Sequence, residues 1–201
     1  MKLKLTRDHL YTVIFMLIVS AVIALVLASA NAYYKPMIDQ NALVADRTAV
    51  LYVFGLDTGG TSEEILKRYE ENVKPDTNAG VAVQRHVGAQ GETLALAVPF
   101  EGAGLWGRIE GYLGISPDKK TVTGIVFTSQ NETPGLGGRI DELAYREQFR
   151  GLKIEAGRPL AYGPAGGDQI DAVSGATQTS NAVLRMINAL IDNTISRLEV
   201  K

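Results

Sequence analysis

The chain has 201 residues, of which 46% are hydrophobic and 21% charged, and its formal net charge is −2. This length allows one domain of ordinary size plus one additional element. The absence of cysteine excludes disulfides, iron–sulfur ligation and a thiol nucleophile, and two histidines are too few for a histidine-based metal site. Residues 1–35 carry a net positive charge, so the negative charge of the whole chain comes from the residues after them. An acidic domain argues against a nucleic-acid partner.

An uncharged run of 21 residues, Leu10 to Ala30, follows the basic N-terminus. A helix of this length spans a hydrocarbon core of roughly 30 Å. The small residues at the end of the run also resemble a signal-peptide cleavage site, but a signal peptide usually has an apolar core of about 7–15 residues. The run therefore predicts a transmembrane anchor over residues 10–32. The positive-inside rule then places residues 1–9 in the cytoplasm and residues 36–201 outside it.

Beyond the anchor, the sequence predicts a mixture of helices and strands. Thr61 and Glu64 have the spacing of a capping box and open a helix that Pro75 stops. The run Ser116–Lys120 has the composition of a turn and is expected to join two strands as a hairpin. The predicted helices are 43–56, 63–73 and 139–149, the predicted strands are 93–98, 109–115, 122–128, 152–154 and 160–162, and 76–92 is a predicted loop. Antiparallel strands with helices at the ends indicate an α+β fold.

The last predicted helix begins in the run DAVSGATQTS, Asp171 to Ser180. Apolar residues recur at helical spacing from Ala182 to Leu198, and Ser174 is the expected N-cap. A helix N-terminus has unpaired N–H groups and a partial positive charge, both of which favour a phosphate. Thr177 follows two very small residues at this position, so it is well placed to carry a phosphate ester. The alternative interpretation is an ordinary capped helix start without chemistry.

The same run resembles the flavinylation motif of the FMN-binding domain family: Asp, two further residues, Ser or Thr, then Gly, Ala and Thr. In that family FMN is joined through its phosphate to the last threonine, which is Thr177 here. The resemblance implies that FMN is a covalent cofactor of this chain. It also implies that the motif residues surround the point of attachment: Asp171, Ser174, Gly175, Ala176 and Thr177.

A second motif, ETPGLG, occupies the six residues before Gly138. Its proline fixes one backbone angle, and its glycines permit a close approach of the backbone to a flat or charged ligand. Taken alone, the motif is most simply a turn after a strand. The same hexapeptide is a hallmark of the FMN-binding domain family, in which it precedes the flavinylation motif by about forty residues, as here. The resemblance implies a set of flavin contacts: Glu132, Thr133, Pro134, Gly135, Leu136 and Gly137.

Within this family, Gly-Leu-Trp at 104–106 and the early helix ending in Gly-Leu at 55–56 resemble the C subunit of the sodium-pumping NADH:quinone oxidoreductase (Nqr). The G subunit of the Rnf complex is the alternative. The resemblance implies a single-pass flavoprotein subunit of the bacterial inner membrane, with a periplasmic FMN-binding domain that relays electrons and is not catalytic alone. The implied partners are other membrane subunits of an Nqr or Rnf complex, a flavin transferase and the lipid bilayer.

Other classes of function have weaker support in the sequence. Residues 102–107 match the G-x-G-x-x-G pattern, but a dinucleotide site needs a helix to start there, and the residues that follow alternate as a strand does. A hydrolase with Ser174 or Thr177 as nucleophile would lack a histidine base. An anchored anion-binding module without redox chemistry also fits a phosphate seat. Acidic pairs at 63–64 and 70–71 are most simply a solvated helix face.

Overall fold

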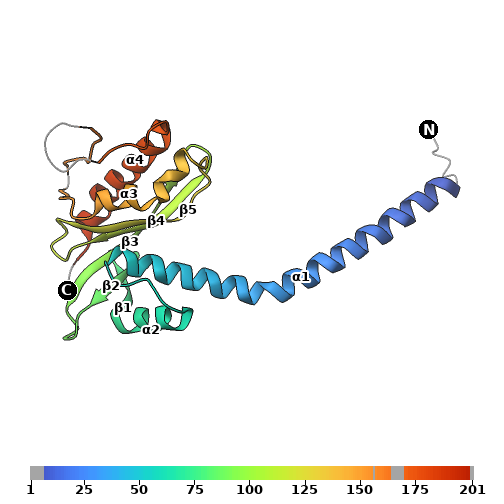
Figure 1. Cartoon of the computed structure of the whole chain (residues 1–201), viewed down its shortest axis with the longest axis horizontal. Coiled ribbons are helices and arrows are strands. Elements are labelled where there is room, and N and C mark those ends of the chain that lie inside the picture. The colour runs from blue at the N-terminus through green and yellow to red at the C-terminus, as the bar shows by residue number, and fades with distance from the viewer. Residues whose placement is uncertain (1–6, 156, 164–169, 200–201) are drawn as a thin grey trace. The chain divides into compact units, whose positions relative to one another are not determined.

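The computed structural model describes residues 7–155, 157–163 and 170–199. The chain divides into two compact units, Met1–Leu43 and Val44–Lys201, and each is described by itself. Helix α1, Arg7–Val53, contributes to both units (Figure 1). The glycine-rich run at 164–169, which precedes the predicted last helix, lies outside the described residues.

The described part of the first unit is a single helix. The predicted anchor lies within α1, and its large apolar side chains are exposed. Among the described residues, one helix is long and apolar enough to cross a membrane. The sequence predicted a separate helix over 43–56, but α1 continues through Pro36 to Val53 without a break. An ion pair between Lys35 and Asp39, one turn apart with 3.3 Å between Nζ and Oδ2, supports the helix around this proline.

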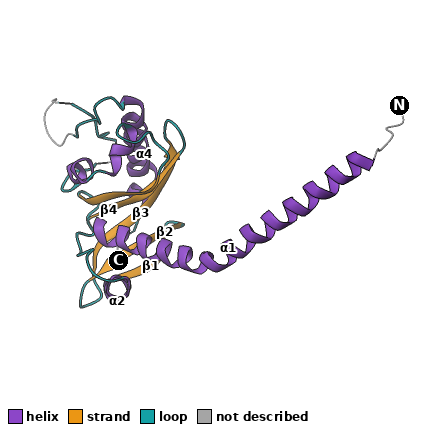
Figure 2. Cartoon of the chain, turned by 45° about the vertical axis from the view of Figure 1, so that its right-hand side comes forward, coloured by secondary structure: helices purple, strands orange, loops and turns teal. Residues whose placement is uncertain are grey.

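The second unit is built on a five-stranded antiparallel sheet in which every strand pairs with its neighbour in sequence, in the order β1-β2-β3-β4-β5. The strands are β1 (Val73–Asn78), β2 (Val81–Val87), β3 (Thr93–Ala103), β4 (Arg108–Ile115) and β5 (Val122–Ser129). Helix α4 (Thr177–Asn193) and the short helix α3 (Leu143–Arg146) cover one face of the sheet (Figures 1 and 2). The end of α1 and helix α2 (Ser62–Asn72) lie on the other face. The predicted α+β class is confirmed.

Three local predictions hold in detail. The capping box opens α2, because Thr61 Oγ1 accepts from Glu64 N at 3.3 Å and Glu64 Oε2 accepts from Thr61 N at 2.7 Å. The turn at 116–120 joins β4 to β5 as a hairpin. The acidic pairs of α2 are exposed to solvent.

The predicted loop at 76–92 was wrong, because most of it forms β1 and β2. These strands form a hairpin whose tight turn has Ala79 and Gly80 at φ 50° and 79°. Strand β1 lies at the edge of the sheet, and Val73 is its only buried residue. An edge strand with a polar sequence has no alternation of apolar residues from which it could be recognised.

The predicted helix at 139–149 and the predicted short strands after it were also wrong. Residues 137–149 form η1 (Gly137–Asp141), α3 and η2 (Glu147–Phe149), with Glu142 extended between the first two. Ile140 and Tyr145 are both buried but stand five residues apart, a spacing that one regular helix does not place on one face. The predicted strands at 152–154 and 160–162 are reduced to isolated bridges.

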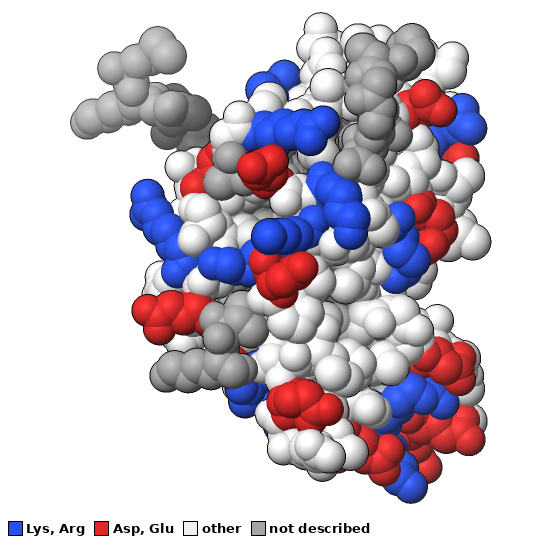
Figure 3. Space-filling model, turned by 90° about the vertical axis from the view of Figure 1, so that its left-hand side faces the viewer, with Lys and Arg blue, Asp and Glu red and all other residues white. Residues whose placement is uncertain are grey.

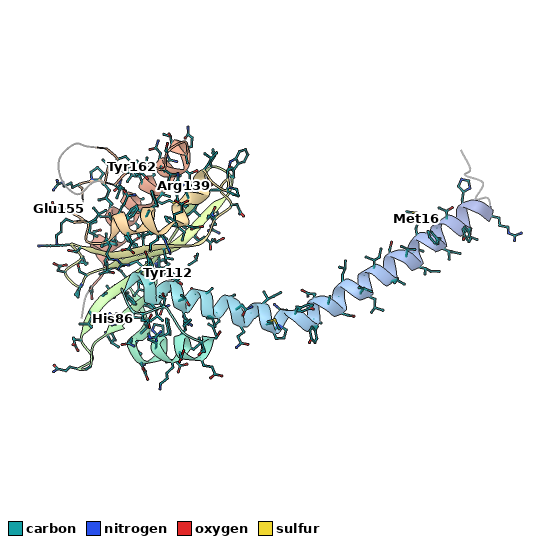
Figure 4. The ribbon with its side chains drawn as sticks, in the orientation of Figure 1. Met16, His86, Tyr112, Arg139, Glu155 and Tyr162 are labelled. Atoms are coloured by element: carbon teal, nitrogen blue, oxygen red, sulfur yellow. The ribbon has the colours of Figure 1, made fainter. Side chains whose placement is uncertain are left out.

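The two faces of the sheet have separate apolar clusters. One cluster joins alternate residues of β3, β4 and β5, such as Val98 and Leu113, to the buried face of α4. The other joins the end of α1 and α2 to residues of opposite parity, such as Ala97 and Val126. Figure 4 labels Arg139 and Tyr162 on the α4 side and His86 and Tyr112 on the α1 side.

On the surface in Figure 3, acidic residues gather at the lower end, whereas basic residues gather in the upper half.

Candidate functional site

Thr177 is the first residue of α4 and is exposed. The N-cap is Ala176, which makes no side-chain capping bond, and Ser180 N to Ala176 O at 3.0 Å is the first hydrogen bond of the helix. The N–H groups of the first turn, Thr177 to Thr179, therefore stand before the first intrahelical bond and have no capping side chain. Such a turn can accept an anion, and here it has a hydroxyl at its edge.

The prediction that Ser174 caps the helix was wrong. Ser174 and Gly175 form a turn in which Gly175 has φ 77°, and this left-handed residue delays the helix by two positions. A side chain caps a helix from the residue directly before its first turn, and Ser174 lies two residues too early. Its side chain is exposed on the loop.

The loop before Thr177 is held by side chains that the sequence did not single out. Ser180 Oγ accepts from Val173 N at 3.0 Å, and Gln148 Oε1 accepts from Asp171 N at 2.6 Å. Tyr162 donates to the carbonyl oxygen of Ser180 at 2.7 Å. Burial raises the pKa of the Tyr162 hydroxyl, so it stays a donor. The Ser180 side-chain bond fixes the loop against the first turn of α4, and the Gln148 bond fixes it against η2.

The ETPGLG motif has an inner and an outer part. Glu132 and Gly137 are buried, whereas the four residues between them are exposed: Thr133, Pro134, Gly135 and Leu136. Gly135 has φ 74°, and the carbonyl oxygen of Thr133 accepts from Leu136 N at 3.1 Å and from Gly138 N at 3.0 Å. The outer part is therefore a tight turn that presents an apolar side chain, Leu136, to the surface.

The carboxylate of Glu132 is directed into the protein. One oxygen, Oε1, accepts from Leu105 N at 2.8 Å and from Trp106 N at 3.1 Å. The other, Oε2, accepts from Thr179 Oγ1 at 2.5 Å. Gly137 is needed for this arrangement, because a Cβ there would lie 2.6 Å from Thr179 Oγ1. The inner part of the motif thus connects the β3–β4 loop to α4.

The two motifs lie side by side. A Cβ built on Gly175 would lie 3.2 Å from Leu136 Cδ2, so the exposed turn of one motif contacts the loop of the other. The G-x-G-x-x-G pattern covers the end of β3 and the β3–β4 loop, where no helix begins, and this loop is hydrogen-bonded to Glu132 of the ETPGLG motif. Leu105 and Trp106 on this loop are 53% and 70% exposed. The exposed apolar side chains of Leu105, Trp106 and Leu136 therefore lie on two segments that Glu132 connects to the first turn of α4.

Two concave surfaces adjoin these segments. One, of about 250 Å³, is lined by Arg139, Tyr145 and Gln148 together with residues 171–174 of the flavinylation motif. The other, of about 590 Å³, is formed by residues 101–108 of the β3–β4 loop. The site thus offers an exposed hydroxyl, uncapped N–H groups and apolar side chains at the surface.

The supporting residues could have been found from one signal. Thr179, Ser180 and Val183 share a helix face, and the apolar periodicity places that face in the core. Hydroxyl residues on a buried helix face require hydrogen-bond partners, and here the partners are Glu132 and the loop backbone.

Known proteins are similar to this chain over the segment that contains both motifs. Residues 104–192 match the model of the FMN-binding domain family, a range that includes both motifs and the β3–β4 loop. The chain is similar to the C subunit of the Na(+)-translocating NADH-quinone reductase of Pasteurella multocida, with 39% identity over 46% of this chain and 38% of that protein. It is also similar to the protein of the same name from Neisseria meningitidis serogroup A, with 29% identity over 86% of this chain and 85% of that protein.

Solved structures share the fold. The crystal structure of the protein of this name from Parabacteroides distasonis aligns with a TM-score of 0.63 and 27% identity over 78% of this chain and 93% of that one. NqrC from Shewanella oneidensis aligns with a TM-score of 0.64 and 23% identity over 72% of this chain and 89% of that one. The predicted resemblance to the FMN-binding domain family and to the C subunit of Nqr is confirmed.

Proposed function

We propose that this chain, in which residues 104–192 match the FMN-binding domain family, is the subunit of an Nqr-type complex that carries covalent FMN on Thr177. In this role it is one relay within an oxidoreductase that transfers electrons from NADH to quinone and moves Na⁺. The observation that carries the proposal is the exposed Thr177 at the uncapped start of α4, directly beside the ETPGLG turn.

The site fits the phosphate of FMN. The ester oxygen would be Thr177 Oγ1, and the remaining phosphate oxygens would accept from the first N–H groups of α4. The helix dipole favours a negative charge at this end. Attachment requires an activated donor such as FAD. The bond from Thr177 Oγ1 to phosphorus forms, the pyrophosphate bond breaks, and AMP leaves while the hydroxyl proton goes to solvent.

The neighbouring surface suits the flavin ring. Leu105, Trp106 and Leu136 are exposed apolar side chains around the attachment point, and apolar and aromatic surfaces favour a flat ring system. Thr133, with its exposed side chain, is the polar contact that we assign. Bound FMN supplies the redox chemistry, and the protein holds and orients it. The phosphate link leaves the ring itself chemically unaltered.

We assign α1 the role of a membrane anchor, with the N-terminus in the cytoplasm and the domain on the periplasmic side. The length and apolar surface of the helix support the span, and Lys2, Lys4 and Arg7 support the orientation. The partners would then be the other membrane subunits of the complex and, during maturation, a flavin transferase. The similarity to C subunits of Nqr favours an Nqr complex over an Rnf complex.

Intact-mass spectrometry of the chain purified from cells with a flavin transferase tests the attachment. The expected mass increase is about 438 Da, the mass of FMN minus water. The variant Thr177→Val keeps the size of the side chain but removes the ester oxygen, so it should lose the mass increase and the in-gel flavin fluorescence. Ser174→Ala removes the other hydroxyl of the motif but not the acceptor, so it should weaken attachment less than Thr177→Val does.

The rival functions give different results. A non-redox anion-binding module predicts an unmodified mass and a colourless protein after denaturation. A hydrolase predicts covalent labelling of Ser174 or Thr177 by a phosphonate probe. Flavin fluorescence that persists in Thr177→Val would show that another residue is the acceptor.

A further inference from the structure

We propose that Glu132 is a positioning residue that couples the first turn of α4 to the Leu105–Trp106 loop, and that this coupling sets the rate of flavin attachment at Thr177. The effect on the rate of flavin attachment rests on the proposed function. The coupling of loop and helix by Glu132 does not depend on it.

Glu132 is an unusual residue for its location. Its relative exposure is 5%, and in the described part of the chain no Lys, Arg or His forms an ion pair with it. A buried carboxylate without a cation costs free energy unless hydrogen bonds compensate for its lost hydration. Here hydrogen bonds provide that compensation, because both oxygens accept bonds from protein groups.

The three bonds come from two segments far apart in sequence. Leu105 and Trp106 donate backbone N–H groups from the β3–β4 loop, and Thr179 donates its hydroxyl from α4. Gly104 makes room for this carboxylate, because a Cβ there would lie 2.4 Å from Glu132 Oε1. One side chain therefore fixes the spacing between the loop and the helix.

The Thr179 bond has a particular effect at the attachment site. Thr179 lies two residues after Thr177, in the turn whose N-cap position provides no side-chain bond. Its bond to Glu132 is charge-assisted and restrains that turn from the side of the ETPGLG motif. Loss of the bond would free both the turn that presents the Thr177 hydroxyl and the loop that carries Trp106.

The chain provides a direct reporter of this coupling, because Trp106 is its only tryptophan. Time-resolved fluorescence anisotropy of the unflavinylated full chain in detergent measures the mobility of the Trp106 loop without any flavin. The second readout is the initial rate of FMN attachment by a flavin transferase with FAD, followed by intact mass.

Thr179→Val is the central variant, since it keeps the shape of the side chain and removes the donor. We expect the fast anisotropy component to at least double, and attachment to slow about tenfold, as for the loss of one charge-assisted hydrogen bond. Thr179→Ser keeps the hydroxyl and should restore both readouts. Glu132→Gln keeps the shape of the side chain but makes the Thr179 bond a neutral one, so it should fall between the wild type and Thr179→Val.

Thr123→Val is the matched control. Thr123 Oγ1 is buried and has no hydrogen-bond partner among the described residues, so this exchange breaks no bond. If Thr179→Val matches Thr123→Val in anisotropy, the coupling is refuted. If the loop loosens but attachment keeps its rate, the role in attachment is refuted. A wild-type chain that accepts no flavin would refute the proposed function, while the anisotropy comparison would still decide the role of Glu132. If Thr179→Val does not fold, Glu132→Ala in the same assays tests the same bonds.

Discussion

Replacement of Arg150 should uncouple the end of α1 from the rest of the domain. The last turn of α1 has no basic residue of its own. Arg150, just after η2, provides the basic group at this helix end. Its Nη2 donates to the carbonyl oxygen of Tyr52 at 3.2 Å, and its Nη1 donates to the carbonyl oxygen of Thr123 on β5. The guanidinium also forms a two-pronged ion pair with Glu147, with Nε to Oε2 at 2.8 Å and Nη2 to Oε1 at 3.1 Å. This pair lowers the pKa of Glu147.

The size of the effect follows from these contacts. Arg150→Ala removes the guanidinium donor from two carbonyl groups and a carboxylate, of which the Tyr52 carbonyl keeps its bond from Gly55 N and the Glu147 carboxylate keeps its bond from the Tyr52 hydroxyl. Because the Arg150 side chain is 32% exposed, water replaces part of what is lost. We therefore assign about 1 kcal/mol to each of the three partners, below the range for fully buried charged bonds, or about 3 kcal/mol in all. For a domain of this size the melting temperature should fall by roughly 6–12 °C.

Differential scanning calorimetry of the full chain in detergent measures this change. Arg150→Lys keeps the charge but loses the planar fork, so it should recover about half of the loss. Arg108→Ala is the matched control, since Arg108 pairs with Glu101 in an ion pair whose side chains are 59% and 60% exposed and should contribute less than about 1 kcal/mol. A fall for Arg150→Ala no larger than for Arg108→Ala would refute the reasoning.

Three further predictions test the site, the fold and the topology. Gly135→Ala should lower the free energy of unfolding by about 1–2 kcal/mol, because Gly135 has a left-handed φ of 74°. Gly137→Ala should lower it more in the same calorimetric assay, because its Cβ would lie 2.6 Å from Thr179 Oγ1. The reverse order would contradict the structure. Burial lowers the pKa of His86, so the folded state favours the neutral ring and stability should fall as the pH drops below about 6.5. Denaturant unfolding above and below that pH should show this slope, and His86→Gln should flatten it. Ser62→Cys gives the cysteine-free chain one exposed thiol, which an impermeant maleimide should label in intact cells; labelling only after lysis would place the domain in the cytoplasm.

The sequence predicted best what local chemistry determines. The capping box at Thr61 and Glu64 and the turn at 116–120 depend on a few adjacent residues, and both formed as expected. The buried face of α4 followed from apolar periodicity over several turns. The α+β class followed from the order of these elements.

Features that depend on distant partners were missed. Strand β1 forms because β2 supplies its hydrogen bonds, not because its own residues are apolar. In the glycine-rich turn, sequence alone cannot distinguish inward from outward side chains. The carboxylate of Glu132 therefore turned out to bind loop and helix groups, while flavin contact by the exposed residues 133–136 stays a prediction.

The division of the domain by its sheet has a consequence for how such a chain can evolve. The cluster beneath α4 and the cluster against α1 and α2 draw on opposite sides of the same strands. Substitutions in separate clusters that share no partners add nearly independently in their effect on stability. The α1–α2 layer can therefore diverge to suit a different neighbour while the α4 side of the sheet stays unchanged. Selection can act on one surface of this domain without repair mutations on the other.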